Sequence, residues 1–273
     1  MTGQPFIKMH GLGNDFVVLD ARAQALPDMT PRLVAALADR KTGIGCDQLI
    51  TIAPSQAADL RMRIFNADGG EVEACGNATR AVGLLEGRPA RIETIGGLLE
   101  AAPTDGGIAV DMGVPRFDWN AIPLAYAMDT LKMPVGWENL ESPSAVNVGN
   151  PHIVFFVDDC SNADLERLGP LIENDPLFPE RINVNVASVD ARDAIRLRVW
   201  ERGVGETRAC GTGACATAIA AMRRGMTDRA VTVSLEGGDL RIAWDDAGRI
   251  TMTGPAVESF RGDFDPADFG IAR

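Results

Sequence analysis

Two cysteines stand in the same seven-residue context in the two halves of the chain. The first copy, GEVEACG, covers residues 70–76 and the second, GETRACG, covers residues 205–211, so that five of the seven positions are identical. In each copy the cysteine, Cys75 or Cys210, precedes a glycine and a run of small or helix-forming residues. A thiol at a helix N-terminus faces unpaired N–H groups and the positive end of the helix dipole, and both favour the thiolate. We therefore expect two activated thiols with lowered pKa values.

A pair of such thiols is suited to one of two chemistries. The thiols could form a disulfide in a redox cycle, or one could take a proton from a carbon while the other returns a proton to the opposite face. The small residues that follow each cysteine, Gly76 in one copy and residues 211–214 in the other, let a ligand approach the backbone amides closely. Helix N-termini bind carboxylates and stabilise the charge that develops when an α-carbon loses its proton.

The other cysteines, Cys46, Cys160 and Cys215, lack this repeated context, and we expect them to pack in the core. Five cysteines are an odd number, which argues against a disulfide framework. There are only two histidines and no paired zinc-binding motif, so no metal is expected. The glycine-rich stretches lack the Rossmann and P-loop patterns, which gives little support to nucleotide binding.

Several amide side chains lie in loops marked by glycine or proline. Asparagine in a loop is often turn chemistry alone, but several converging amides would recognise the ammonium and carboxylate groups of a zwitterion. These amides are Asn14, Gln48, Asn66, Asn77, Asn150 and Asn183.

Charged and titratable residues lie near the second cysteine copy. Glu201 and Arg202 end an expected strand just before that copy, where they form either a surface ion pair or a two-point contact to an amino acid. His152 is either a structural histidine or a base that helps to activate a thiol.

The composition excludes some classes of partner. The chain has 273 residues, with 26 basic and 38 acidic side chains and a formal net charge of −12. Such a chain repels phosphate backbones and anionic lipids, so we expect neither nucleic acid nor membrane as a partner. The N-terminal stretch has no apolar signal-peptide region, and the longest apolar runs are too short to span a bilayer. We expect a cytoplasmic protein.

The elements that must position these residues recur in the same order in both halves. Hydrophobic periodicity and glycine and proline punctuation predict a helix that begins at Thr30–Pro31, one after Cys75 that ends near Leu85, one near residues 162–174, and one after Cys210 that ends near Arg224. Residues 175–188 are interpreted as a loop. Strands are predicted at residues 5–9, 15–20, 59–66, 90–95, 98–102, 107–112, 194–200, 229–235, 239–244 and 249–253, and strand-like character at 144–159.

The repeat extends beyond the cysteines. The segment LRMRIF of residues 60–65 aligns with IRLRVW of residues 195–200 at the same offset, and Gly13–Asn14 recurs as Gly149–Asn150. We therefore predict an α+β fold of two similar halves related by a pseudo-twofold axis, each a mostly antiparallel strand barrel around a central helix. The halves are expected at 1–117, possibly completed by the C-terminal tail 262–273, and at 118–261, with the active site in the cleft between them.

Taken in order, the motifs resemble the diaminopimelate epimerase family. They are MHGLGNDFVVLD, GIGCDQL, FNADGGEVEACGN, VGNPH, PERINVN and ERGVGETRACGTGACA, and they extend from about residue 8 to residue 216. The resemblance implies an isomerase that interconverts LL- and meso-2,6-diaminopimelate by two-thiol proton transfer, without pyridoxal phosphate or another cofactor, in lysine and peptidoglycan precursor biosynthesis. A homodimer is compatible with it, although the sequence decides nothing about oligomeric state.

The resemblance also implies roles for individual residues. Cys75 and Cys210 would be the acid and base, with His152 and Glu201 in support. The backbone amides of Gly76, Asn77, Gly211 and Thr212 would hold the reacting carboxylate. The remaining substrate-binding residues would be Asn14, Gln48, Asn66, Asn150, Asn183, Glu201 and Arg202.

Two positions depart from the pattern common in the family. Ala78 stands where many members have glycine, and Cys46 where many have phenylalanine. Neither change removes a ligand group. A racemase or epimerase of the proline and hydroxyproline type is the alternative within this architecture, and a dithiol redox protein is the alternative from another class.

Overall fold

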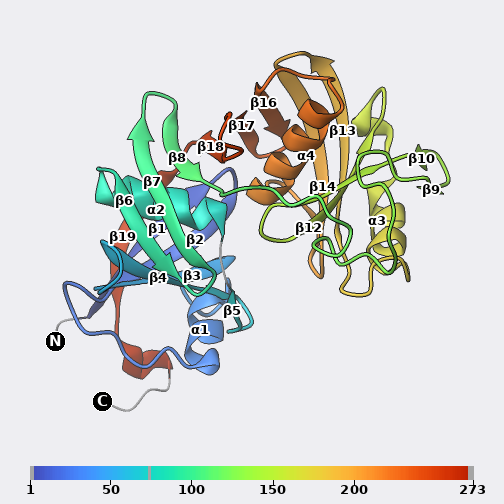
Figure 1. Ribbon diagram of the computed structural model, residues 1–273. Helices are drawn as coiled ribbons and strands as arrows, with labels where there is room; N and C mark the ends of the chain where they lie inside the picture. Colours follow the sequence, from blue (N-terminus) through green and yellow to red (C-terminus); the bar gives the residue numbers. More distant parts are fainter. Residues whose placement is uncertain (1–2, 73–74, 270–273) are drawn as a thin grey trace. The chain divides into compact units, whose positions relative to one another are not determined.

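The computed structural model describes residues 3–72 and 75–269, and the chain divides into two compact units (Figure 1). Unit 1 consists of Met1–Val110 with Gly254–Arg273, and unit 2 of Asp111–Thr253. Glu73 and Ala74 of the first cysteine copy, and residues 270–273 of the expected C-terminal tail, lie outside the described residues.

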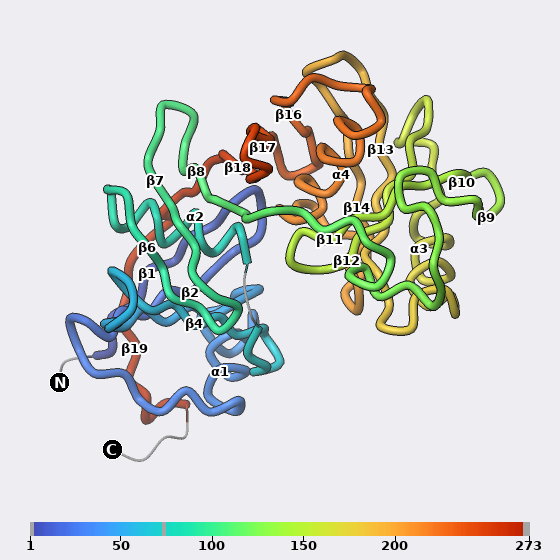
Figure 2. Tube along the Cα trace, viewed as in Figure 1, coloured from blue at the N-terminus to red at the C-terminus, as the bar shows by residue number. Residues whose placement is uncertain are grey.

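Unit 1 is a mixed sheet that surrounds one helix. β1 pairs antiparallel with β2 and with β19, β3 with β4, β4 with β5 and β6 with β7, while β2–β3 and β4–β6 are parallel. Figure 2 shows the C-terminal β19 returning beside β1. The bounds are β1 (Gln4–Gly11), β2 (Asn14–Asp20), β3 (Gln48–Ala53), β4 (Leu60–Asn66), β5 (Glu71–Val72), β6 (Ala90–Thr94), β7 (Gly97–Thr104), β8 (Gly107–Asp111) and β19 (Val257–Phe264).

Each parallel pair in unit 1 needs a crossover, and a helix lies in each one. Helix α1 (Pro31–Ala38) connects β2 to β3, and its Thr30 cap accepts a hydrogen bond from the Leu33 N–H group, as the capping signal predicts. Helix α2 (Gly76–Glu86) lies between β5 and β6, and packs against β1, β6, β7 and β19. It ends at Gly87, whose left-handed conformation (φ 64°) is the expected stop.

Unit 2 is built in the same way. β11–β12, β13–β14, β14–β15, β16–β17 and β17–β18 are antiparallel, while β12–β13 and β14–β16 are parallel. The bounds are β9 (Gly136–Trp137), β10 (Leu140–Glu141), β11 (Ser144–Asn147), β12 (Pro151–Phe156), β13 (Asn183–Ala191), β14 (Ala194–Glu201), β15 (Gly205–Thr207), β16 (Ala230–Leu235), β17 (Gly238–Trp244) and β18 (Ile250–Gly254).

Helix α4 (Gly211–Arg223) is the central helix of unit 2, and α3 (Leu165–Glu173) packs against β13, β14 and β15. α4 packs against β11, β12, β13, β14, β16 and β17. Its core-facing residues are mostly small, and Ala214, Ala218 and Ala221 are fully buried. Small side chains let a surrounding sheet approach the helix axis closely, which explains the alanine-rich sequence. The short helices η1 (Cys160–Asn162) and η2 (Pro266–Phe269) complete the described residues.

The two units therefore repeat one pairing scheme. The order antiparallel, parallel, antiparallel, antiparallel, parallel, antiparallel occurs from β1 to β7 and again from β11 to β17. The repeated arginine and glutamate of the sequence form the same two-point ion pair in each unit. Arg63 donates to Glu71 at 2.8 Å, and Arg198 donates to Glu206 at 2.8 and 3.0 Å. Each pair fixes the strand that precedes the cysteine. The prediction of two similar α+β halves around central helices is confirmed.

Some predicted elements differ from the structure. Residues 175–188 are not wholly a loop, because β13 begins at Asn183 and runs parallel to β12. Asparagines have low strand propensity, so Asn183 and Asn185 do not indicate a strand in the sequence, although the first six residues of β13 are all buried. The unit boundaries fall at 110/111 and 253/254, earlier than the expected 117/118 and 261/262, because the mostly exposed residues of β19 form a strand of unit 1.

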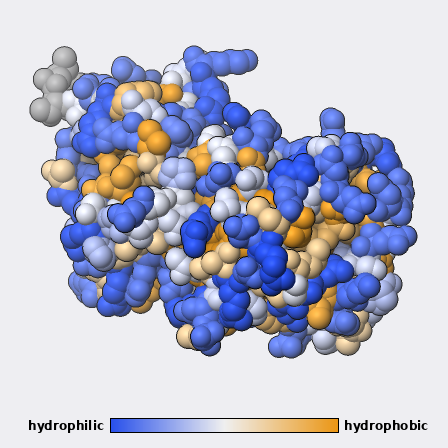
Figure 3. All heavy atoms as spheres, turned by 90° about the horizontal axis from the view of Figure 1, so that it is seen from above, coloured by the Kyte–Doolittle hydropathy of each residue, from blue (hydrophilic) through white to orange (hydrophobic). Residues whose placement is uncertain are grey.

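The visible surface is mixed in polarity. On the face in Figure 3, hydrophilic residues predominate and hydrophobic residues form small patches between them. Within residues 3–72 and 75–269, no helix is long and apolar enough to cross a membrane.

Candidate active site

Both repeated cysteines are the N-cap residues of the two central helices. Cys75 precedes α2 and Cys210 precedes α4, and each has an extended backbone conformation, with φ −146° and −131°. The backbone amides of Gly76 and Gly211 begin the first turns. Each unit thus places one thiol beside the unpaired N–H groups of a buried helix.

In unit 1, Cys75 lies beside two of the predicted amides. Its Sγ is 4.0 Å from Asn14 Oδ1, and this same oxygen accepts a hydrogen bond from Asn77 Nδ2 at 3.2 Å. Cys75 is partly exposed, whereas Asn77 is only 4% exposed. The Asn14 amide therefore presents an acceptor to the thiol.

The orientation of the Asn14 amide is set by a charged cluster. Asn14 Nδ2 donates to Asp47 Oδ2 at 3.2 Å, and Arg40 bridges Asp47 and Asp15 at 2.6 Å each. Lys8 also pairs with Asp15, at 2.5 Å. Burial raises the pKa of Asp15, but its hydrogen bonds to Arg40 and Lys8 more than offset this, so its pKa lies well below the usual range. Asp15 and Arg40 are therefore charged at neutral pH, and the cluster keeps the Asn14 oxygen on the side of Cys75.

A second pair of predicted residues lies at neighbouring strand ends in unit 1. Gln48 opens β3 and Asn66 closes β4, where they face each other in the strand register. Gln48 Nε2 donates to Asn66 Oδ1 at 3.0 Å. Gln48 Oε1 is buried and has no hydrogen-bond partner among the described residues, which leaves it available as an acceptor for a ligand.

In unit 2, Cys210 is surrounded by donors and one carboxyl group. Its Sγ accepts a hydrogen bond from the Gly213 N–H group at 3.3 Å and lies 3.5 Å from the Thr212 hydroxyl. The thiol also hydrogen bonds to Glu201, and Glu201 Oε1 accepts from the Thr207 hydroxyl at 2.5 Å. The thiol therefore has a carboxylate within hydrogen-bonding reach.

Burial controls the protonation of this pair. Burial raises the pKa of Cys210 well above its ordinary value, and the negative charge of Glu201 raises it further. Burial also raises the pKa of Glu201, although its hydrogen bonds lower the pKa in part. The sequence analysis expects a lowered pKa for Cys210, but in this structure burial of the 5% exposed thiol raises the pKa by more than the hydrogen bond from the Gly213 N–H group lowers it.

Both ring nitrogens of His152 lie beside amide side chains. Nε2 lies 2.8 Å from Asn150 Oδ1, and Nδ1 lies 3.1 Å from Asn185 Nδ2. Burial of the ring lowers the pKa of His152 to about 3, and the positive charge of Arg202 lowers it further. A neutral, fully buried imidazole with both nitrogens engaged is suited to orienting Asn150.

The remaining predicted residues meet at the start of β13. Asn183 Nδ2 donates to the Pro151 carbonyl at 2.8 Å, and its Oδ1 accepts from the Arg202 N–H group at 3.0 Å. Glu173, a buried carboxylate that the sequence analysis missed, accepts from the Trp200 indole and the Gly203 N–H group, both at 2.8 Å. It thereby holds both sides of the Glu201–Arg202 turn.

Comparison with known proteins gives the family. A sequence model described as "Diaminopimelate epimerase" matches residues 6–117 and 144–258. The chain belongs to the diaminopimelate epimerase family. A diaminopimelate epimerase of Erythrobacter litoralis is 70% identical over 97% of this chain and 98% of the relative, and one of Rhizorhabdus wittichii is 65% identical over 97% of each.

Solved structures share the fold of the family at low sequence identity. A hydroxyproline epimerase from Agrobacterium vitis has a TM-score of 0.64 at 16% identity, with 98% of this chain and 95% of that chain covered. A probable proline racemase from Agrobacterium radiobacter has a TM-score of 0.67 at 18% identity, covering 98% and 96%. These likenesses concern the fold alone.

Sequence reasoning missed residues that support the predicted ones in this family member. Asp47 lies next to Gln48 in the glycine-rich loop, and Asn185 lies two residues after Asn183, on the same side of β13. The strand alternation could have indicated Asn185 if residues 175–188 had not been interpreted as a loop. Asp47 carried no comparable signal, because its role depends on Arg40 and Asp15 from other elements.

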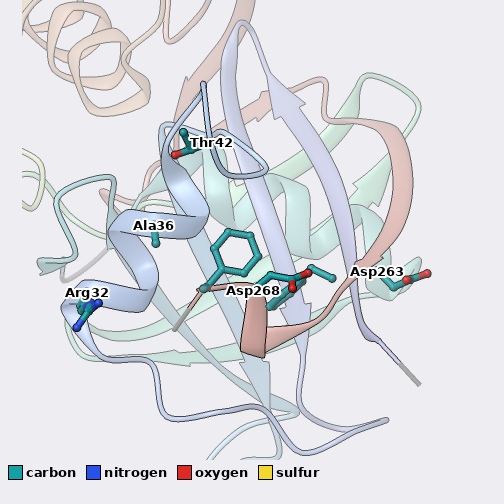
Figure 4. A pocket seen from close by; sticks show the side chains of 7 residues that line it. Arg32, Ala36, Thr42, Asp263 and Asp268 are labelled. Carbon is teal, nitrogen blue, oxygen red and sulfur yellow. The ribbon is translucent and has the colours of Figure 1, made fainter. Parts of the chain in front are cut away.

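Other features stand apart from these groups. Cys46, Cys160 and Cys215 are buried in the cores, as predicted, and burial raises the pKa of Cys46 to about 11. A pocket between α1 and η2 contains none of the predicted site residues, and we assign it no role in the reaction (Figure 4). It is lined by Arg32, Ala36, Thr42, Asp263, Phe264, Asp268 and Phe269.

Proposed function

We propose that this chain interconverts LL- and meso-2,6-diaminopimelate by removing and replacing the proton on one α-carbon. The observation that carries the proposal is the equivalent placement of Cys75 and Cys210 as N-cap residues of the central helices. Inversion of a stereocentre needs one proton-transferring group on each face, and a repeated unit supplies the same group twice. Membership in the family supports this substrate over a proline-type one.

In this mechanism one thiolate takes the α-proton and the other thiol returns a proton to the opposite face. The N–H groups at the starts of α2 and α4, at Gly76, Asn77, Gly211 and Thr212, hold the carboxylate next to the reacting carbon and stabilise its developing charge. Glu201 takes the proton of Cys210 when that residue must act as the base, since the two side chains hydrogen bond.

The distal amino-acid group of the substrate is the asymmetric part that must be recognised. We assign its ammonium and carboxylate groups to the amide and charged residues at the strand ends. His152 acts on Asn150, with which it hydrogen bonds. The assigned residues are Asn14, Gln48, Asn66, Asn150, Asn183, Glu201 and Arg202.

Hydrogen exchange with the solvent tests this function. Incubation of the LL isomer in deuterated water should yield meso product with deuterium at the inverted centre, read by mass spectrometry and NMR. Cys75→Ser and Cys210→Ser should each lower kcat by about 10²–10⁴, because each removes one acid–base group. Cys160→Ala, a core position, is the control and should keep its activity. Product without solvent deuterium would contradict the proposal.

A substrate panel separates the alternatives. Proline and 4-hydroxyproline should show no α-proton exchange, whereas a proline-type racemase would exchange them. A dithiol redox protein would turn over disulfide substrates and leave the α-proton of diaminopimelate in place.

We further propose that the chain acts in the cytoplasm as a homodimer. Cys46, Cys160 and Cys210 form no disulfide, which suits a reducing compartment. Light scattering after size exclusion should give twice the 29.1 kDa of one chain, and a single-chain mass would contradict the dimer.

A further inference from the structure

Asn185 is a fully buried polar side chain that the mechanism does not use. It lies on β13, where its Nδ2 donates to the Ile153 carbonyl at 2.9 Å and lies 3.1 Å from His152 Nδ1. A backbone carbonyl can only accept a hydrogen bond, so the atom that faces it must be the amide nitrogen. The orientation of the Asn185 amide is therefore fixed by the backbone of the neighbouring strand.

The orientation of the Asn185 amide determines the tautomer of His152. One hydrogen of Asn185 Nδ2 bonds to the Ile153 carbonyl, so the other points to His152 Nδ1, which must then accept a hydrogen bond. A neutral imidazole that accepts at Nδ1 carries its proton on Nε2, and Nε2 lies 2.8 Å from Asn150 Oδ1. Asn150 thus uses its oxygen on the histidine, which leaves its NH2 group for another partner.

The other end of Asn185 borders the cysteine turn. Its Oδ1 is buried with no hydrogen-bond partner in the described part of the chain, and a Cβ added to Gly213 would lie 2.8 Å from it. Gly213 is the residue whose N–H group donates to Cys210 Sγ. One side chain therefore touches both the turn that holds Cys210 and the histidine that holds Asn150.

We propose that Asn185 is a positioning residue that, through the tautomer of His152, turns the Asn150 amide so that its NH2 group faces a carboxylate of the substrate. This inference rests on the proposed function for the identity of that substrate. The reversed amide would place its oxygen against the carboxylate, which would replace a hydrogen bond by a repulsion. The chain of hydrogen bonds that links the Ile153 carbonyl, Asn185, His152 and Asn150 contains no charged group.

The tautomer can be measured without substrate. The chain has only His10 and His152, so that ¹⁵N-histidine labelling gives two rings, and a His10→Gln variant assigns them. We expect His152 at pH 7 with a protonated Nε2 and an unprotonated Nδ1. A protonated Nδ1 in the full-length parent protein would overturn the proposal, whatever the enzyme assays show.

Substitutions link the tautomer to substrate binding. Asn185→Asp places an acceptor beside Nδ1, so His152 should move its proton there, and KM for diaminopimelate should rise about 10-fold or more with a smaller change in kcat. Asn139→Asp, the same change in the exposed turn between β9 and β10, should match the parent. Asn185→Leu, which removes the donor without adding charge, serves if the aspartate variant does not fold, and should raise KM with a mixture of tautomers.

The outcomes separate this inference from the proposed function. A changed tautomer with an unchanged KM would overturn the inference while solvent deuterium still entered the product. If no deuterium enters the product of the parent protein, the proposed function fails, and the tautomer spectrum still decides how Asn185 and His152 are arranged.

Discussion

The two units hold equivalent asparagines in opposite orientations. Asn14 is the first residue of β2 and Asn150 directly precedes β12, each after a glycine with positive φ. The Asn14 NH2 group donates to Asp47, and the Asn14 oxygen faces Cys75. The Asn150 oxygen instead hydrogen bonds to His152, which leaves the Asn150 NH2 group for another partner. A repeated scaffold thus presents an acceptor in one unit and a donor in the other.

The supports of these amides differ in kind as well. Unit 1 uses the charged cluster of Asp47, Arg40 and Asp15, which is partly exposed, with 56% of the Arg40 side chain accessible. Unit 2 uses buried neutral groups, His152 and Asn185, both at 0% exposure. The two amides therefore have supports of different kinds, and we expect salt to affect the support in unit 1 more than that in unit 2.

The largest expected difference between the units concerns thiol reactivity. Cys75 is partly exposed, whereas Cys210 is 5% exposed and has a pKa raised by burial and by Glu201. Because the thiolate is the reactive form, iodoacetamide at pH 7.5 should modify Cys75 at least about 20-fold faster than Cys210. Peptide mass spectrometry over a time course measures both rates in one sample.

Cys46 provides the internal reference for this experiment. Burial raises the pKa of Cys46 to about 11, and its side chain is 2% exposed, so its modification should be as slow as global opening. Equal rates at Cys75 and Cys210, both above that of Cys46, would contradict the difference between the units.

A smaller effect should follow when the charged support of Asn14 is weakened. Asp47→Asn removes the carboxylate that accepts from Asn14 and pairs with Arg40, so that the Asn14 amide can turn its NH2 group toward Cys75. Loss of one charge-assisted hydrogen bond, about 1.5 kcal/mol, should lower kcat/KM about 10-fold. Steady-state assays of Asp105→Asn, the same charge change in an exposed turn, give the matched control. Identical kcat/KM values in the two variants would remove Asp47 from the positioning of Asn14.

Most of this architecture was predictable because it is repeated. The duplicated cysteine copy and the aligned arginine-containing segments 60–65 and 195–200 indicated two equivalent units. The Thr30–Pro31 cap and the Gly87 stop located helix ends by local chemistry alone. The differences between the two units were harder to predict from the sequence. Asn14 is oriented by Asp47, which is distant in sequence, and Asn150 by the nearby His152, whose own partner Asn185 is distant. The raised pKa of Cys210 depends on burial, which a cap motif does not reveal.

The smallest expected effect concerns Glu201, where the alignment of the two halves places the neutral Asn66 in unit 1. Burial raises the pKa of Glu201 above the value of 4.5 that it has when unfolded. Between that value and the folded pKa, the native state binds more protons than the unfolded state, so stability falls as pH rises through this window. Glu201→Gln removes this cost and keeps an acceptor for the Thr207 hydroxyl.

We therefore expect Tm of Glu201→Gln at pH 7.5 to exceed that of the parent by up to about 3 °C, with the difference shrinking as the pH is lowered toward 4.5. Scanning calorimetry across this range measures it. Glu206→Gln is the matched control, because it breaks the ion pair with Arg198 and should leave Tm unchanged or slightly lower. A lower Tm for Glu201→Gln than for Glu206→Gln at pH 7.5 would mean that the ionised carboxylate stabilises unit 2. Its place beside Cys210 would then be structural, and the proton acceptor for that thiol would have to be sought elsewhere.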